Sequence, residues 1–101
     1  MSKLLGDRFF FIGVGGIGMS GLARYFRRQG AEVAGYDRTP SELTNQLQSE
    51  GIDVQFNENP ALIPAAYANA PAGKVMVVRT PAVPAASPLL KYWEEKGARI
   101  L

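Results

Sequence analysis

A strand that runs directly into a glycine-rich turn constrains the fold of this chain most. Residues 9–12 (FFFI) form a continuous apolar run, which is typical of a strand covered on both faces in a parallel sheet. Residues 13–18 (GVGGIG) follow at once, and apolar residues then recur at helical spacing from Ile17. A strand, a tight turn and a helix in this order start a βαβ unit, so the chain is predicted to build a parallel sheet.

The rest of the chain continues the alternation of strands and helices. Strands are predicted at residues 8–12, 33–36, 52–56, 74–78 and 98–101, and helices at residues 17–29, 39–50 and 88–96. Residues 57–73 are rich in Ala, Pro and Asn and are predicted to hold at most a short helix near residues 61–67. The fold class is therefore α/β: a three-layer, Rossmann-like fold with a five-stranded parallel sheet in the order 3-2-1-4-5 and helices on both faces.

Local signals set the predicted helix ends. Thr39 is expected to cap the second helix, because Pro40 suits the first helical position and Glu42 has the capping-box spacing. Ser87 followed by Pro88 repeats this pattern for the last helix, and Gly97 is expected to end it.

Length and composition exclude several classes of protein. The chain has 101 residues, which predicts one domain over residues 1–101. It has no cysteine and no histidine, so thiolate zinc sites, cysteine nucleophiles and Ser-His-Asp catalysis are ruled out. A net charge of +2 gives no reason to expect nucleic acid as a partner. No apolar run is long enough for a membrane span, and residues 1–5 reach Asp7 and Arg8 too soon for a secretory signal. We expect a cytoplasmic location, and because the chain stops at a predicted strand we expect a domain cut from a longer protein.

Three loops are predicted to meet where ligands bind in such sheets. Residues 13–18, 37–39 and 80–83 all follow strands, so they share the carboxyl edge of the sheet at the switch point between strands 1 and 4. In the glycine loop, Gly13 is expected to permit the tight turn, Gly15 to let a phosphate approach, and Gly18 to let the helix pack on the strand. The start of the helix then offers free N–H groups to a diphosphate.

Each of these loops also has a purely structural interpretation. The glycines could serve only close helix packing, and Asp37, placed to accept hydrogen bonds from a ribose, could simply be a turn residue. Residues 80–84 could read the edge of a base through rigid backbone groups, or could only connect a strand to a helix. Three arginines of the first helix are interpreted as a solvated face: Arg24, Arg27 and Arg28. The sequence shows no P-loop and no carboxylate cluster for Mg²⁺, so neither catalytic nor metal-binding residues are predicted.

Residues 11–23 (FIGVGGIGMSGLA) closely resemble the opening of the Mur ligase family, in particular the ligases that join L-alanine to UDP-N-acetylmuramate in peptidoglycan synthesis. Residues 35–37 (GYD) and 77–84 (VVRTPAVP) match as well, and the similarity covers nearly the whole chain. The resemblance implies a Rossmann-like N-terminal domain that binds the UDP part of UDP-N-acetylmuramate. The family's ATP, Mg²⁺ and L-alanine sites belong to central and C-terminal domains absent here, so the chain alone is expected to be inactive.

The resemblance also assigns roles to residues. It implies a diphosphate site made by Gly15, Gly16, Ile17, Gly18 and Met19. It implies that Asp37, Arg38 and Thr39 approach the uridine and that Thr80, Pro81 and Ala82 flank the uracil. Two departures stand out: many members carry Gly-His where this chain has Asn57-Glu58, and Ser-Ser-Ala-Ile where it has residues 80–83 (TPAV).

An NAD-binding Rossmann domain of an oxidoreductase or regulatory protein is the alternative. Asp37 lies about twenty residues after the glycine loop, as NAD binding requires, so spacing alone leaves both nucleotides open.

Overall fold

The computed structural model describes residues 8–101. In chain order its elements are β1 (Arg8–Ile12), α2 (Ile17–Arg28), β2 (Glu32–Tyr36), α3 (Glu42–Ser49), β3 (Asp53–Gln55), η1 (Pro60–Leu62), α4 (Ala65–Ala68), η2 (Ala72–Lys74), β4 (Val75–Arg79), α5 (Pro88–Lys96) and β5 (Arg99–Ile100). The expectation that residues 1–5 form no secretory signal lies outside the described residues. Within residues 8–101, no helix has both the length and the apolar character needed to cross a bilayer.

The five strands form one sheet in the order β3-β2-β1-β4-β5, which confirms the predicted order and fold class. All the pairs are parallel, and Phe10 of β1 lies opposite Ala34 of β2 and Val77 of β4. β1 is therefore the central strand, and the chain reverses its direction of travel across the sheet between β3 and β4. This reversal places the switch point beside the end of β1.

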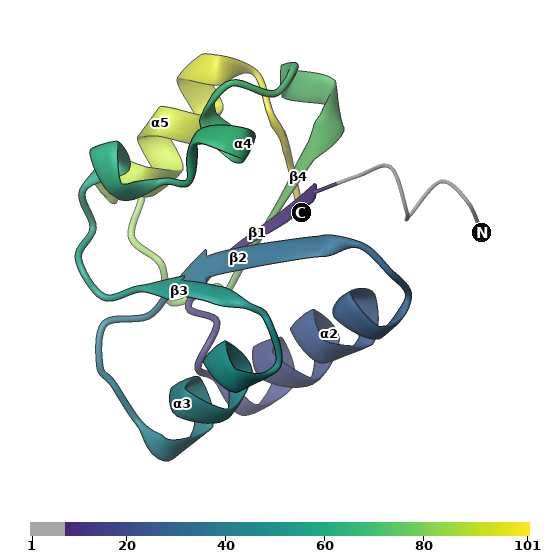
Figure 1. Cartoon of the computed structure of the whole chain (residues 1–101). Helices are drawn as coiled ribbons and strands as arrows, with labels where there is room; N and C mark the ends of the chain where they lie inside the picture. Colours follow the sequence, from purple (N-terminus) through teal and green to yellow (C-terminus); the bar gives the residue numbers. More distant parts are fainter. Residues whose placement is uncertain (1–7) are drawn as a thin grey trace.

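Helices cover both faces of the sheet, and each face has its own apolar core (Figure 1). Alternate residues of β1 divide between the cores: Phe9 and Phe11 face α2 and α3, whereas Phe10 and Ile12 face α4 and α5. The rings of Phe9 and Phe26 stack with their centroids 4.0 Å apart, and this contact ties α2 to the sheet. Burial on both faces is what the apolar run of β1 predicts.

The structure corrects the predicted start of the second helix. Thr39 does not cap it, because α3 begins two residues after Pro40 and its cap is Ser41. The Ser41 hydroxyl accepts from the Thr44 N–H at 3.1 Å, and the Thr44 hydroxyl accepts from the Ser41 N–H at 2.8 Å. The predicted capping box paired Thr39 with Glu42, whereas the observed one pairs Ser41 with Thr44, the third residue of the helix. The other predicted start is correct: Ser87 caps α5 by accepting from the Leu90 N–H.

Residues 57–74 are more ordered than the sequence predicts. Two short 3₁₀ segments and the single turn of α4 replace the expected short helix. Ile63 and Tyr67 anchor this segment, because both are buried in the core under α5.

Candidate functional site

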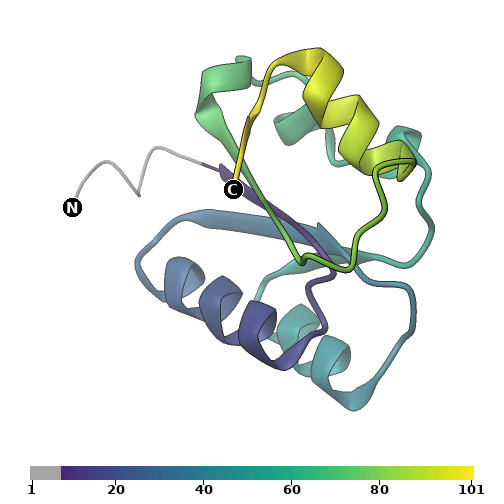
Figure 2. The same ribbon diagram turned by 180° about the vertical axis from the view of Figure 1, so that it is seen from behind.

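The glycine loop is attached directly to the end of β2. The N–H groups of Gly13 and Val14 both donate to the carbonyl oxygen of Tyr36, at 2.7 and 3.0 Å. Gly13 has a φ of +95°, a conformation that favours glycine. A Cβ at this position would lie 3.1 Å from Cγ2 of Thr80. The loops after β1, β2 and β4 therefore meet, as predicted, and Figure 2 shows the loop between β4 and α5 at this same edge.

The carboxylate of Asp37 organises two of these loops. Its Oδ1 accepts from the Gly15 N–H at 3.0 Å, and its Oδ2 accepts from the Thr39 N–H at 3.2 Å. The bond to Thr39 makes Asp37 a turn residue, as one of the two interpretations held. The bond to Gly15 was not expected from the sequence. Each carboxylate oxygen retains a further lone pair, so Asp37 can still accept from a ligand hydroxyl.

The first turn of α2 presents free backbone donors. The Gly16 N–H donates to Gly13 O at 3.2 Å, and the first helical bond runs from Ser20 N–H to Gly16 O at 2.7 Å. Within residues 8–101, the N–H groups of the three residues between them have no acceptor: Ile17, Gly18 and Met19. These groups carry the positive end of the helix dipole. An anion placed here would satisfy all of them at once.

A cavity of about 270 Å³ opens beside the glycine loop. Its lining comes from the ends of β1 and β2 and from the loops that follow β1, β2, β3 and β4. The lining residues are Ile12, Gly13, Tyr36, Asp37, Arg38, Glu58, Thr80, Ala82, Val83 and Pro84. The volume lies just below the roughly 300 Å³ at which drug-sized sites begin, so the cavity suits one ring and its substituents rather than both halves of a dinucleotide.

The loop after β3 is fixed to the start of α5 through Glu58. The Ser87 hydroxyl donates to Glu58 Oε2 at 2.7 Å while it accepts from the Leu90 N–H at 3.3 Å. Ser87 is buried, with 2% of its surface exposed. The cap of α5 thus holds a carboxylate at the wall of the cavity, and Glu58 Oε1 makes no hydrogen bond within residues 8–101.

Tyr36 lies among these charges. Burial raises the pKa of its hydroxyl, the Glu58 carboxylate raises it further, and Arg38 opposes the shift. The phenol is therefore neutral at physiological pH and can both donate to and accept from a ligand.

The structure changes the roles of two glycines. A Cβ at Gly15 would lie 2.8 Å from Cγ of Asp37. The missing side chain of Gly15 therefore leaves room for the Asp37 carboxylate, where the expected neighbour was a phosphate. A Cβ at Gly18 would meet nothing within 4 Å, so the expectation that Gly18 permits close helix packing is wrong. The close approach occurs instead at Gly35 of β2, where a Cβ would lie 2.7 Å from Phe11 O of β1 and 3.1 Å from Val14 Cβ of the glycine loop.

The predicted site residues fall into three groups. Asp37, Arg38, Thr80 and Ala82 line the cavity. The loop residues 15–19 lie beside it at the start of α2. Thr39 and Pro81 are exposed and do not line the cavity.

Sequence reasoning missed Ile12, Tyr36 and Glu58 as lining residues. The first two adjoin predicted loop residues, so a wider window would have found them. Glu58 had only its position after a strand as a signal.

The predicted solvated face of arginines on α2 is confirmed for Arg27 and Arg28, which are exposed. Arg24 is half-buried: it donates to Glu50 Oε1 and to Gln46 Oε1, both at 2.9 Å, and so joins α2 to α3. Arg27 lies against Gly51, as described below.

The sheet order and the loop cluster define a Rossmann-like domain with its candidate site at the switch point. Residues 8–101 match the family described as "Mur ligase family, catalytic domain". The chain belongs to the Mur ligase family, which confirms the resemblance seen in its sequence.

Individual relatives agree with this assignment. The chain is 48% identical over 94 residues to the UDP-N-acetylmuramate–L-alanine ligase of Porphyromonas gingivalis and 47% identical over 94 residues to that of Flavobacterium johnsoniae. Each match covers 93% of this chain but 20% of the relative. The chain thus spans about a fifth of the length of the curated relatives it matches.

Solved structures show the same fold. The UDP-N-acetylmuramate–alanine ligase MurC of Thermotoga maritima superposes with a TM-score of 0.77 at 26% identity, over 92% of this chain and 20% of that one. The murein peptide ligase Mpl of Psychrobacter arcticus gives a TM-score of 0.78 at 24% identity, over 95% of this chain and 19% of that one.

Proposed function

We propose that this chain is the UDP-binding, N-terminal domain of a ligase that joins L-alanine to UDP-N-acetylmuramate in peptidoglycan synthesis. The observation that carries the proposal is the pairing of three free N–H groups at the start of α2 with a ring-sized cavity beside them. A nucleoside diphosphate has this combination of an anionic and a cyclic part. The names of the relatives supply the particular nucleotide sugar.

In this proposal the diphosphate lies over the first turn of α2. The amides of Ile17, Gly18 and Met19 donate to its oxygens, since these amides have no acceptor within residues 8–101. Gly15 and Gly16 set the conformation of the loop and do not donate to the diphosphate, because their N–H groups already donate to Asp37 and Gly13. Asp37 accepts from a ribose hydroxyl with the lone pairs that its two backbone partners leave free.

The uracil occupies the cavity between the loops after β2 and β4. Thr80, Ala82 and Arg38 line this cavity and contact the base, and Thr39 and Pro81 act only through the shape of their loops. Uracil has one N–H donor on its pairing edge, and Glu58 Oε1 is the acceptor we assign to it. The family's Gly-His pair is thus replaced by an anchored carboxylate in this chain.

The chemistry of the complete ligase lies outside this chain. The muramyl carboxylate takes the γ-phosphoryl group of Mg-ATP to form an acyl phosphate, and the amine of L-alanine displaces phosphate to form the amide. We assign ATP and Mg²⁺ to further domains of a cytoplasmic enzyme, because in this proposal the diphosphate of UDP occupies the free N–H groups at the start of α2. The residues of this chain bind and orient the nucleotide, and the chain alone is inactive.

Saturation-transfer NMR on the 101-residue chain tests the proposal with UDP, UDP-N-acetylmuramate and NAD as separate ligands. We expect transfer to the uracil and ribose protons of UDP, and we expect UDP-N-acetylmuramate to compete it away. Transfer to NAD but not to UDP would favour the oxidoreductase alternative. No transfer to UDP from a folded chain would contradict the proposal.

A matched pair of glycine variants locates the binding. Gly15→Val places a branched side chain against Asp37 and should abolish the UDP signal, whereas Gly21→Ala adds a methyl group in open space on the same helix and should preserve it. Dispersed amide spectra for both variants show that each remains folded.

A further inference from the structure

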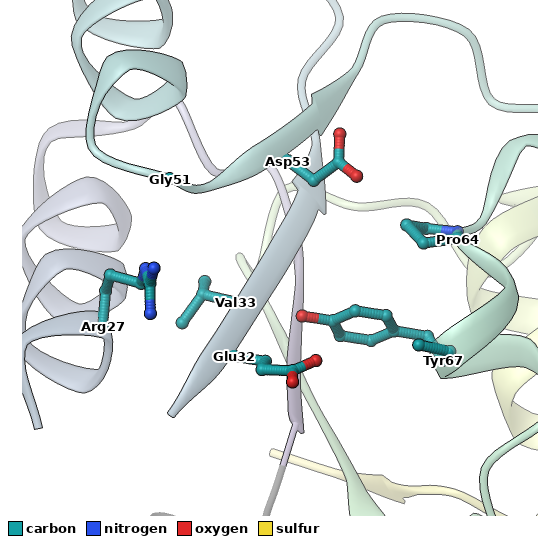
Figure 3. Close-up of a pocket in the computed structure, with 8 residues that line it drawn as sticks. Arg27, Glu32, Val33, Gly51, Asp53, Pro64 and Tyr67 are labelled. Atoms are coloured by element: carbon teal, nitrogen blue, oxygen red, sulfur yellow. The ribbon is translucent and has the colours of Figure 1, made fainter. Parts of the chain in front are cut away.

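A second cavity, of about 410 Å³, lies at the opposite edge of the sheet from the glycine loop. It is formed where β2 and β3 begin, with α2 on one side of the sheet and α4 on the other (Figure 3). β3 pairs with β2 only from Ala34 onward, so the outer edge of β2 at Glu32 and Val33 has no neighbouring strand. The nucleotide proposal uses no residue of this cavity.

Tyr67 points its hydroxyl into this cavity. Its side chain is buried, with 5% of the residue exposed, and its ring packs edge-on against Phe10 at 6.4 Å between centroids. Within residues 8–101 the one fully buried side-chain polar atom without a partner is Trp93 Nε1, so the Tyr67 hydroxyl, which also makes no hydrogen bond there, is open to solvent in the cavity. In Figure 3 it reaches from α4 toward β2 and lies next to the Glu32 carboxylate, with Val33 on the other side of β2. A phenol whose ring is buried and whose hydroxyl is unpartnered in a cavity is available to a ligand.

The side of the cavity nearest α4 is acidic. Asp53 makes no ion pair within residues 8–101, and Glu32 pairs with Arg8 at 3.1 Å through one oxygen only. Burial and then Glu32 raise the pKa of Tyr67, so its hydroxyl stays neutral beside the two carboxylates. Figure 3 shows the Tyr67 hydroxyl next to the Glu32 carboxylate and Asp53 well apart from them, so Glu32 and Tyr67 can both accept from one primary ammonium group while Asp53 adds negative charge to the cavity. Pro64, Ala66 and Val33 supply apolar surface for a short carbon chain.

The opposite side of the cavity is basic. Arg27 extends from α2 across Gly51, whose φ of +90° and missing side chain leave room for it. A Cβ at Gly51 would lie 2.9 Å from Nη2 of Arg27. The guanidinium has only one weak contact within residues 8–101, from Nη1 to Ala31 O at 3.5 Å. Its remaining donors can bind a carboxylate.

We propose that this cavity is a binding site for a small aminocarboxylate. Its ammonium group is held by Glu32 and the Tyr67 hydroxyl, Asp53 adds negative charge at the same side of the cavity, and its carboxylate is held by Arg27. Val33 lies between the two poles, so a ligand that reaches both must cross the open edge of β2 (Figure 3). A molecule with opposite charges at its two ends fits this arrangement better than a simple cation or anion.

Amide NMR titration of the 101-residue chain tests the proposal with three probes of increasing length: glycine, β-alanine and 4-aminobutyrate. We expect saturable shifts of the Val33, Gly51 and Asp53 amides with at least one of them. Butylammonium and butyrate each lack one charged end and should bind about tenfold more weakly, because each forfeits a charge-assisted contact. Absence of saturable shifts with every aminocarboxylate, or equal affinity for butylammonium, would overturn the proposal.

Variants separate the two ends of the site. Asp53→Asn and Arg27→Gln should each weaken the best probe about tenfold. Tyr67→Phe keeps the buried ring and removes only the unpartnered hydroxyl, and it should weaken binding about threefold to tenfold. Lys91→Gln, an exposed change on α5, is the control and should leave binding unchanged. Unaltered affinity in both Asp53→Asn and Arg27→Gln would rule out the site, and the amide spectrum reports folding in each case.

Discussion

Gly15 and Asp37 lie 22 residues apart in the chain and are joined by a hydrogen bond of 3.0 Å from the Gly15 N–H to Asp37 Oδ1. This bond connects the glycine loop after β1 to the loop after β2 across the carboxyl edge of the sheet. The position that predicts a ribose-binding role for Asp37 therefore also lets its carboxylate hold the glycine loop in place. An acidic residue here has a structural role whichever nucleotide binds.

Replacing Gly15 by alanine should destabilise the domain. The new Cβ would lie 2.8 Å from Cγ of Asp37, so the carboxylate must turn away and give up its bond to the loop. We expect a loss of roughly 1–3 kcal/mol in the free energy of unfolding, measured by urea denaturation. Gly18→Ala is the matched control, since its Cβ meets open space. A Gly15→Ala variant as stable as the Gly18→Ala variant would show that the bond contributes nothing.

Gly35 should tolerate no side chain. A Cβ there would lie 2.7 Å from the carbonyl oxygen of Phe11, a backbone atom that cannot move without disturbing the sheet. Gly35→Ala should therefore cost roughly 1–3 kcal/mol. Gly21→Ala, in the exposed face of α2, should instead stabilise the chain by about 0.5–1 kcal/mol because alanine is the better helix former. Thermal unfolding of the two variants should shift in opposite directions.

Ser87 should contribute more to stability than an ordinary helix cap. Ser87→Ala removes the acceptor for the Leu90 N–H and also the donor to Glu58. We expect a loss of about 1–2 kcal/mol from the cap alone, seen as a lower midpoint of thermal unfolding. Ser49→Ala, at the exposed end of α3, should change stability by no more than about 0.5 kcal/mol. Equal midpoints for the two variants would contradict this role of Ser87.

Alkaline pH should unfold the domain partly through Tyr67. Burial and the Glu32 carboxylate raise the pKa of this residue above its ordinary value of 10.0. The folded chain keeps the phenolic proton where the unfolded chain loses it. The stabilisation is therefore complete below pH 10 and declines as pH rises toward the folded pKa, by up to about 1.4 kcal/mol per pH unit.

Denaturation with urea at about pH 9 and about pH 11 measures this contribution. The wild-type chain should lose more stability over that interval than Tyr67→Phe, which has no phenolic proton to lose. Tyr36, whose pKa is also raised, is retained in both proteins and therefore cancels in the comparison. Equal losses would show that Tyr67 ionises alike in the folded and unfolded chains.

Glu58 should discriminate among bases if UDP binds as proposed. Glu58→Gln keeps the size and shape of the side chain, and its amide oxygen can still accept from Ser87. The atom in place of Oε1 is then an NH₂ group, which donates and cannot accept from uracil. We expect UDP affinity to fall about tenfold with little change in stability. Calorimetric titration with UDP measures the affinity, and an unchanged value would remove Glu58 from the uracil site.

The sequence by itself determined the order of the elements and the edge of the sheet at which the loops meet. Residues 9–12 have no polar alternation, so they had to be a strand covered on both faces, and the glycine turn that follows fixed the βαβ connection. Local capping chemistry also set the start of α5 after Ser87, because the N–H group that this cap accepts from, that of Leu90, lies within one helical turn.

The tertiary structure decided the contacts that join distant residues. Asp37 accepts from Gly15, Ser87 donates to Glu58, and Tyr67 lines one cavity with Glu32 and Asp53. Each of these arrangements depends on where separate loops lie once the sheet has formed. Gly18 of α2 and Gly35 of β2 illustrate the limit: only the fold shows that a Cβ at Gly35 would clash with Phe11 and Val14, whereas a Cβ at Gly18 would meet no atom within 4 Å. Sequence spacing predicts which residues share an edge, but packing in three dimensions determines which atoms meet.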